Sequence, residues 1–429
     1  MKRVRSPLPG RLAAAMLVAF CGSATWAEEP PSHSGEATAA EETAAPVRPW
    51  NAFESKWISG RLFGGLALDT VRHAQEEGSE EEFGDLTDYE KPEVRVARLG
   101  LAGTINFSKP WGYYISGAYL GFGRGFDRQT DDSWSLFDLR LEIPAGRIGR
   151  LTVGKFKEPF SMERLMGGGV MPGIERAMGT DALTPARNVG VQLGNSFAGD
   201  RMTWAAGVFN DWAFTGESFD RAASQVIGRL TGLVLDRPHG GGLLHAGVSG
   251  RYSDVKPGFL KFSTTPEVFQ FPTVLDTGEF PANTMTHGLI ELYYQRGPLW
   301  LGGEAFSTWI DSPESGNPRF SSAWVQGSWI VNGDSRPYLR ERGIFGVLRP
   351  ERSVTEGGVG LFEVGARLST VDLEDGAVNG GEASRLTGIA NWYLTARTLL
   401  AFNYGLIRLD LAGVESTVHT FQLRLFILF

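Results

Sequence analysis

The C-terminal segment of the chain alternates between apolar and polar side chains and ends on an aromatic residue. From position 421 onward, every second residue is apolar or aromatic: Phe421, Leu423, Leu425, Ile427 and Phe429. The interleaved positions include Thr420, Gln422 and Arg424. Because successive side chains of a β-strand point to opposite faces, the segment predicts a terminal strand with one apolar and one wet face. Strands of membrane-spanning β-barrels have this pattern, since one face contacts lipid and the other faces the lumen.

The N-terminus predicts export through a cleaved signal peptide at residues 1–27. Four basic residues precede a short apolar stretch at 12–20, and Thr25 and Ala27 are small residues at the positions that determine cleavage. The apolar stretch is too short to span a bilayer. The single cysteine, Cys21, lies within this segment, so the predicted mature chain has no thiol for a disulfide.

The remaining chain divides into a linker and one folded domain. Residues 28–52 consist mostly of Ala, Glu and Pro, which predicts a disordered periplasmic linker. Residues 53–429 contain no run of about eighteen apolar residues, so helical membrane spans are not expected. Instead, sixteen alternating segments follow one another between positions 56 and 429. We therefore expect an all-β fold, a sixteen-stranded antiparallel transmembrane β-barrel with both ends in the periplasm.

The lengths of the connections predict the orientation of this barrel. Short turns, such as 109–111, suit the periplasmic end, whereas long connections at 73–92, 157–187, 256–283 and 373–383 suit the external end. The third external loop, 157–187, is rich in Gly and Met, and we expect it to fold into the barrel and narrow it. The periplasmic connection at 333–357 is unusually long and contains five arginines.

Strand parity assigns charged side chains to the lumen, because a charge that faces lipid at mid-bilayer costs about 2–4 kcal/mol. The lumen parity includes six strand arginines: Arg61, Arg98, Arg229, Arg367, Arg385 and Arg424. Glu291, Glu304 and Glu363 share that parity, so the lumen is predicted to carry charges of both signs. We expect Arg367 to pair with Glu363 on its own strand.

Several motifs occur in a specific order along the barrel: SGRLFGGLALD, VRVARLGLAGTI, GRLTVGKFKEPFSMERL, IERAM, RNVGVQLG, WAAGVFND, ANWYLT, YGLIRLD and FQLRLFILF. In this order and spacing, the chain resembles the phosphate-selective porin O and P family of Gram-negative outer membranes. The resemblance runs from about Trp57 to Phe429 and covers essentially the whole barrel.

The resemblance implies a pore in the outer-membrane lipid, usually a homotrimer, that conducts small anions such as phosphate or polyphosphate by diffusion. Arg61 matches the arginine of the family's opening strand, Arg98 that of its second strand, and Arg164 a basic residue of the third loop. We predict that pore-lining or anion-binding roles fall to these three and to the other lumen-parity arginines: Arg229, Arg367, Arg385 and Arg424. The fifth loop, 256–283, holds two lysines where the phosphate-selective members carry arginines.

Other function classes fit fewer features of the sequence. A general or weakly selective pore is an alternative, because the formal net charge of −8 becomes −12 without the four basic residues of the signal peptide. An outer-membrane enzyme would need a nucleophile and a base at the external rim, and the sequence offers no clear pair. A soluble β-sandwich adhesin would not need lipid-compatible strands. The histidines lack metal-ligand spacing and the charge is acidic, so we predict no catalysis, cofactor, metal or nucleic-acid partner.

The terminal strand generates the first testable prediction. Replacing Phe429 with Ser should lower the yield of membrane-inserted protein, because the terminal aromatic strand resembles the signal that the barrel-insertion machinery reads. The yield is measured as the heat-modifiable fraction in outer-membrane preparations of the variant and the wild type. Equal yields would contradict the prediction.

Overall fold

The computed structural model describes residues 49–119, 134–211, 223–237 and 241–429. The predicted signal peptide and most of the predicted linker lie outside the described residues. None of the described helices is long and apolar enough to cross a bilayer.

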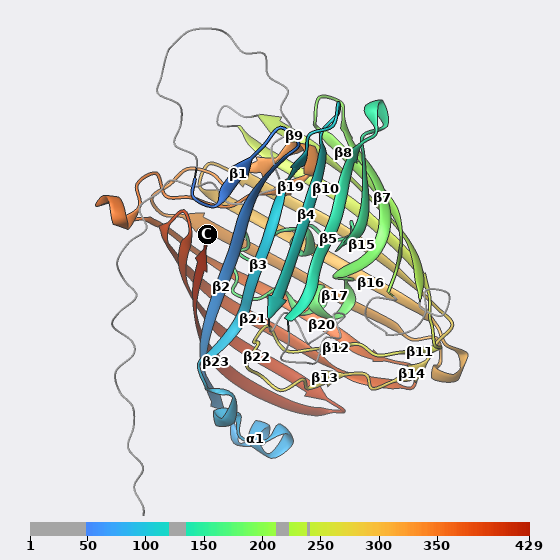
Figure 1. Cartoon of the computed structure of the whole chain (residues 1–429). Coiled ribbons are helices and arrows are strands. Elements are labelled where there is room, and N and C mark those ends of the chain that lie inside the picture. The colour runs from blue at the N-terminus through green and yellow to red at the C-terminus, as the bar shows by residue number, and fades with distance from the viewer. Residues whose placement is uncertain (1–48, 120–133, 212–222, 238–240) are drawn as a thin grey trace, which may run out of the picture.

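Sixteen antiparallel strands form a closed barrel, as the sequence predicted (Figure 1). Each strand pairs with the next along the ring, and the last pairs with the first. The barrel strands are β2 (Ile58–Gln75), β3 (Glu93–Ile105), β4 (Trp111–Tyr119), β5 (Trp134–Pro144), β6 (Arg150–Lys157), β7 (Arg187–Phe197), β8 (Met202–Asn210), β9 (Ser224–Arg237), β10 (Gly242–Asp254), β15 (Thr284–Arg296), β16 (Leu299–Asp311), β17 (Arg319–Ile330), β20 (Leu361–Asp375), β21 (Val378–Thr395), β22 (Thr398–Leu411) and β23 (Val414–Leu428).

The C-terminal residue takes part in closing the barrel. The backbone N–H of Phe429 donates to the carbonyl of Gly64 at 3.1 Å, and Gly64 donates in return at 3.2 Å. A side chain at Gly64 would collide with the Phe429 ring, because a Cβ atom there would lie 2.2 Å from it. Beyond this point β2 continues past the end of β23, and a short strand, β1 (Ala52–Glu54), covers its edge. Covering an edge prevents pairing with another chain.

The alternation along the strands sorts side chains between the two faces of the wall. On β9, Val226, Leu230 and Val234 are 58%, 44% and 67% exposed, whereas Gln225 and Arg229 are 2% and 6% exposed. The apolar face is directed outward, where a lipid bilayer would cover it, and the polar face is directed into the lumen. The predicted inward glutamates Glu291, Glu304 and Glu363 are likewise buried inside the barrel.

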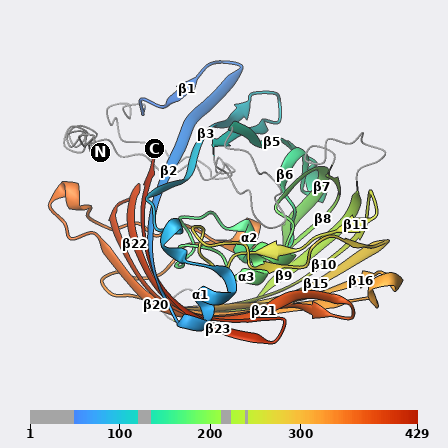
Figure 2. The same ribbon diagram turned by 90° about the horizontal axis from the view of Figure 1, so that it is seen from below.

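Three segments fold into the lumen. The third external loop, 158–186, contains the short helices α2 (Met162–Leu165) and α3 (Met178–Leu183), which lie inside the ring of strands (Figure 2). The fifth loop, 255–283, contains the short strands β11 (Phe259–Leu260), β12 (Ser263–Thr264), β13 (Leu275–Asp276) and β14 (Phe280–Pro281). The long periplasmic segment, 331–360, contains β18 (Tyr338–Leu339), η4 (Arg340–Arg342), β19 (Ile344–Phe345) and η5 (Val354–Glu356). The inward folding of the third loop was predicted, and that of the other two segments was not.

The remaining connections lie at the two rims. The first external loop holds α1 (Glu77–Phe83) and η1 (Leu86–Tyr89), a rim connection holds η3 (Pro313–Ser315), and a periplasmic turn holds η2 (Gly146–Ile148). The predicted long loop at 373–383 is wrong, because β20 and β21 extend through it and meet in a tight turn at Gly376 and Ala377. Leu373 and Val378 on this extension are buried in one cluster with Leu275 of the fifth loop, and this packing stabilises the longer strands.

The anchoring of the periplasmic segment generates the second prediction. Arg336 is 1% exposed, lies 2.5 Å from Glu363 on β20 and donates to the carbonyl of Val170 in the third loop. Replacing Arg336 with Ala leaves a buried carboxylate without its cation, which costs about 3–5 kcal/mol. The temperature at which the heat-modifiable band converts to the unfolded one should therefore fall.

Arg72 provides a matched control. Its side chain is 69% exposed and lies 2.6 Å from Glu90, and such surface pairs contribute about 0–1 kcal/mol. The Arg72→Ala variant should therefore unfold at nearly the wild-type temperature. Equal shifts for the two variants would show that the Arg336 pair does not anchor the segment.

Candidate functional site

A cavity of about 880 Å³ lies in the lumen beside the third loop. Its walls come from one continuous arc of the barrel, β22, β23 and β2 to β9, and from the third loop and the periplasmic segment. The basic side chains along it are Arg95, Arg98, Arg140, Arg150, Lys157, Arg164, Arg176, Arg187, Arg229, Arg342, Arg397 and Arg424. The acidic ones are Asp138, Glu142, Glu175 and Glu341. Cations thus outnumber carboxylates three to one along the described lining.

Asp138 on β5 organises the cations of the strand wall. Its carboxylate lies 2.5 Å from Arg98, 3.0 Å from Arg187 and 3.7 Å from Arg140. Aromatic rings support the same guanidinium groups, since Arg187 lies 3.6 Å from the ring centre of Phe137 and Arg140 lies 4.2 Å from that of Tyr114. Glu142 binds Arg140 at 3.1 Å and Arg150 at 3.0 Å. Two carboxylates are therefore shared among four arginines, and this part of the wall keeps an excess of positive charge.

Three more cations gather at the third loop: Lys157 at the end of β6, and Arg164 and Arg176 in the loop itself. We call them the third-loop cation cluster. The Lys157 ammonium donates to the carbonyls of residues 165 and 166, and Arg176 donates to those of 163 and 166. Arg164 donates to Thr184 at 2.9 Å and lies 3.9 Å from Asp181. Burial, and then the neighbouring Arg164, lower the pKa of Arg176 to about 10. Because the closest acceptors of Arg176 are carbonyl oxygens, its positive charge is only partly neutralised.

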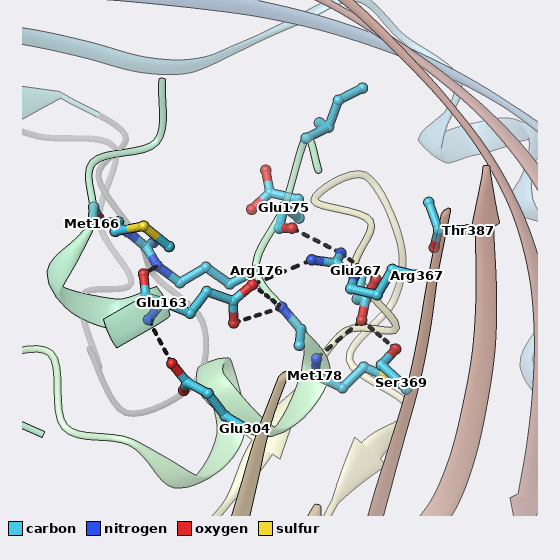
Figure 3. A network of polar contacts seen from close by, with 12 residues as sticks. Glu163, Met166, Glu175, Arg176, Met178, Glu267, Glu304, Arg367, Ser369 and Thr387 are labelled. Atoms are coloured by element: carbon cyan, nitrogen blue, oxygen red, sulfur yellow. Dashed lines mark hydrogen bonds and ion pairs between the residues drawn. The ribbon is translucent and has the colours of Figure 1, made fainter. Parts of the chain in front are cut away.

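Two wall glutamates hold the start of α2, and Figure 3 shows one of them, Glu304, beside Glu163. Glu291 on β15 and Glu304 on β16 lie directly opposite each other, an arrangement of like charges that is destabilising by itself. The backbone N–H of Met162 donates to Glu291 at 3.0 Å, and that of Glu163 donates to Glu304 at 2.8 Å. Arg229 lies 2.6 Å from Glu291 and supplies the positive charge. The third loop and the wall therefore satisfy each other's polar groups.

A glutamate of the fifth loop, Glu267, binds two of the predicted pore arginines. Its carboxylate accepts from Arg367 and Ser369 on β20 and from the backbone of Met178, and it lies 3.8 Å from Arg385 (Figure 3). The side chains of Arg367 and Arg385 are 0% exposed. Both lie in the packed region between the wall and the inward loops, and neither lines the cavity.

The predicted pairing of Arg367 with Glu363 is wrong. Glu363 accepts hydrogen bonds from Arg336 at 2.5 Å and from Tyr393 at 2.8 Å. Arg367 instead binds Glu163 and Glu267. The reason is that inward-folded segments bring charged groups within reach that strand parity alone does not show.

Glu175 fixes the far end of the third loop to two strands. It lies 2.8 Å from Arg95 on β3 and also pairs with Arg424 on β23, which in turn binds Asp69 at 2.6 Å. Burial raises the pKa of Glu175, but the two guanidinium groups outweigh this effect and hold the pKa well below its usual range. Glu175 is therefore ionised at neutral pH and neutralises part of the charge of this pair of arginines.

The structure separates the predicted site residues into two groups. Arg98, Arg164, Arg229 and Arg424 line the cavity, whereas Arg61, Arg367 and Arg385 do not. Arg61 pairs with Ala52 of β1, in the part of β2 that lies beyond the end of β23. The residue of β2 that pairs with Arg98 is Gly65, four residues after Arg61. At about 3.3 Å per residue, this offset is about 13 Å toward the periplasm.

Sequence reasoning missed several cations of the cavity. Arg140 could have been found from the sequence, because the apolar residues on both sides of it, Leu139 and Leu141, indicate the outward parity of β5. Both leucines are exposed in the structure. Arg187 was missed because the prediction assigned it to the third loop, 157–187, whereas β7 begins at this residue. Lys157 and Arg176 carry no signal of this kind, since their positions depend on how the third loop folds.

Solved structures show that the barrel has the architecture of outer-membrane porins. One is an anion-selective porin from Comamonas acidovorans, at 14% identity, with a TM-score of 0.52 and coverage of 87% of this chain and 100% of that one. Another is the trimer form of OmpT from Vibrio cholerae, at 13% identity, with a TM-score of 0.50 and coverage of 87% and 100%. At these identities the likeness shows the fold alone.

Sequence comparison identifies the family. The model of the phosphate-selective porin O and P family matches residues 73–426, and the chain belongs to this family. It is therefore a porin of the Gram-negative outer membrane. An uncharacterized protein of Caulobacter vibrioides is 24% identical over 307 residues, and the match spans 67% of this chain and 60% of that protein. The matched family region begins after Arg61 and contains the other six predicted site residues.

The position of the third loop generates the third prediction. Deleting residues 165–174 should raise single-channel conductance, because Val170, Met171 and Ile174 occupy the lumen and line the cavity. Conductance is measured in planar bilayers with protein whose heat-modifiable migration shows a folded barrel. An unchanged conductance of the folded variant would mean that this loop does not limit the flow of ions.

Proposed function

We propose that this porin conducts small anions passively and has no catalytic activity. The observation that carries the proposal is the third-loop cation cluster, in which Lys157 and Arg176 bind carbonyl oxygens in place of carboxylates. Anions entering the cavity can therefore interact with charge that the protein itself does not neutralise. The charge acts strongly here, because a narrow lumen has a lower effective dielectric constant than open water.

The acidic balance of the whole chain does not oppose this proposal. Acidic residues at the rim, such as those of the first external loop, act through solvent, where salt screens charges beyond about 8–10 Å. The cavity cations act directly on a permeating ion. Local charge at the narrow part of the lumen should therefore determine selectivity.

The cavity-lining arginines Arg98, Arg164, Arg229 and Arg424 are the predicted residues that we assign to anion passage. Among these four, Arg98 has the most exposed side chain, at 27%. Arg367 and Arg385 are assigned a bracing role, because Glu267 holds both in the packed region. Arg61 is assigned to the periplasmic mouth, where burial, and then the charge of Arg61, lower the pKa of Arg397.

A homotrimer and the passage of inorganic anions, phosphate among them, complete the proposal. The trimer is supported by the similarity of the fold to the trimer form of OmpT from Vibrio cholerae. Passage of an inorganic anion is supported by membership of a phosphate-selective porin family and by the fold shared with the anion-selective porin from Comamonas acidovorans. A weakly selective pore is the second candidate, because Asp138, Glu142 and Glu175 neutralise part of the arginine charge.

The cation cluster generates the fourth prediction. The double variant Lys157→Gln/Arg176→Gln should lower the anion-to-cation permeability ratio at least tenfold, because a single charge acting at about 10 Å in a medium of dielectric constant about 20 already contributes about 1.7 kcal/mol, and the variant removes both cations. The ratio is obtained from the reversal potential in a potassium chloride gradient, repeated with potassium phosphate. Glutamine keeps an N–H donor for the loop carbonyls.

Arg72→Gln on the external rim is the control for this experiment, and it should leave the ratio near the wild-type value. A wild-type channel that prefers potassium over chloride would refute the anion proposal and favour the weakly selective pore.

A further inference from the structure

Part of the cavity lining is apolar, although lumen-facing strand positions are normally polar. Leu399 and Ala401 on β22 point inward and are 8% and 3% exposed, while their neighbour Phe402 points outward and is 42% exposed. On β23, Phe426 has the lumen parity of Arg424 and lines the cavity. These positions cannot face lipid, so membrane contact does not account for their apolar character.

The third loop extends this surface. Ile174 is 4% exposed and packs in one cluster with Leu399 and Ala401, and Phe426 packs against the same cluster. We call these four residues the apolar strip. All four also line the cavity. The strip is therefore a largely buried, apolar part of the cavity lining.

The third-loop cation cluster lines the same cavity. Aromatic rings also occur there, since Arg98 lies 4.8 Å and Arg187 lies 3.6 Å from the ring centre of Phe137. The cavity of about 880 Å³ falls within the range of about 300–1,000 Å³ found for small-molecule sites. Its lining thus combines an apolar strip with cations, and the space is large enough for an organic molecule to contact both.

We propose that the preferred solutes are organic acids in which a carboxylate is joined to an apolar body. This inference rests on the proposed anion passage and names its substrate class. The carboxylate would bind at the third-loop cation cluster, and the apolar body would lie against the apolar strip. An inorganic phosphate can use only the cations, so the strip contributes nothing to its binding.

The experiment compares anions with and without an apolar body as blockers of the chloride current through single wild-type channels. The probes are benzoate, acetate and inorganic phosphate. Benzoate should block half of the current at a concentration roughly tenfold lower than acetate, because removing a ring from water is favourable. Benzoate should also block at a lower concentration than phosphate.

Two variants locate the effect. Leu399→Asn introduces a polar group into the apolar strip and should abolish the difference between benzoate and acetate. Arg176→Gln should weaken the block by both acids. Phe402→Leu, on the outward face of the same strand, is the matched control and should keep the difference. Heat-modifiable migration verifies that each barrel is folded, and the wild-type comparison stands even where a variant fails to fold.

The outcomes separate this inference from the proposed function. An anion-selective channel that benzoate and acetate block equally, or that phosphate blocks best, would overturn the substrate class and leave anion passage intact. A cation-selective wild-type channel would overturn anion passage and the substrate class together. Loss of the benzoate preference in Phe402→Leu as well as in Leu399→Asn would also overturn the role of the strip.

Discussion

The third loop can stay inside the barrel only if its backbone N–H groups find acceptors there, because unpaired buried polar groups are costly. Glu291 and Glu304 provide them. The two carboxylates face each other across neighbouring strands and would repel each other in an empty lumen. The N-terminus of α2 donates to both, and Arg229 balances one of them. The loop therefore stabilises the glutamate pair of the wall, and the pair stabilises the inward position of the loop.

The same principle decides which arginines remain available to a solute. Carboxylates of the inward segments and the wall neutralise some of them, as Glu267 does for Arg367 and Arg385. Carbonyl oxygens bind others, as in the third-loop cation cluster, and these carry only partial charge. Counting lumen arginines therefore overestimates the charge that a permeating ion meets. What matters is whether each cation has a carboxylate or a carbonyl as its partner.

Much of the barrel could be predicted from the sequence, because the wall depends on a local and repetitive signal. The penalty for a charge facing lipid places Arg229 and Glu304 inward without knowledge of any neighbour. The lumen depends on contacts between residues far apart in the chain, such as Arg336 with Glu363 and Glu175 with Arg424. Nothing in strand parity shows that 331–360 turns inward, and the error at 373–383 arose because packing on the fifth loop extends two strands. The third loop was predictable because its composition suits contact with a wall.

The filling of the lumen also determines where a passage can lie. The fifth loop and the periplasmic segment pack beside β15 to β21, where Tyr293, Trp300 and Phe345 form a buried aromatic group. The open volume is therefore displaced toward β2 to β9 and the end of β23. Because the displaced cavity borders β22 and β23, its lining includes Leu399 and Phe426 as well as the third-loop cations. The off-centre cavity therefore offers a solute both apolar and cationic side chains. The apolar contact of a solute thus follows from the same packing that closes the rest of the lumen.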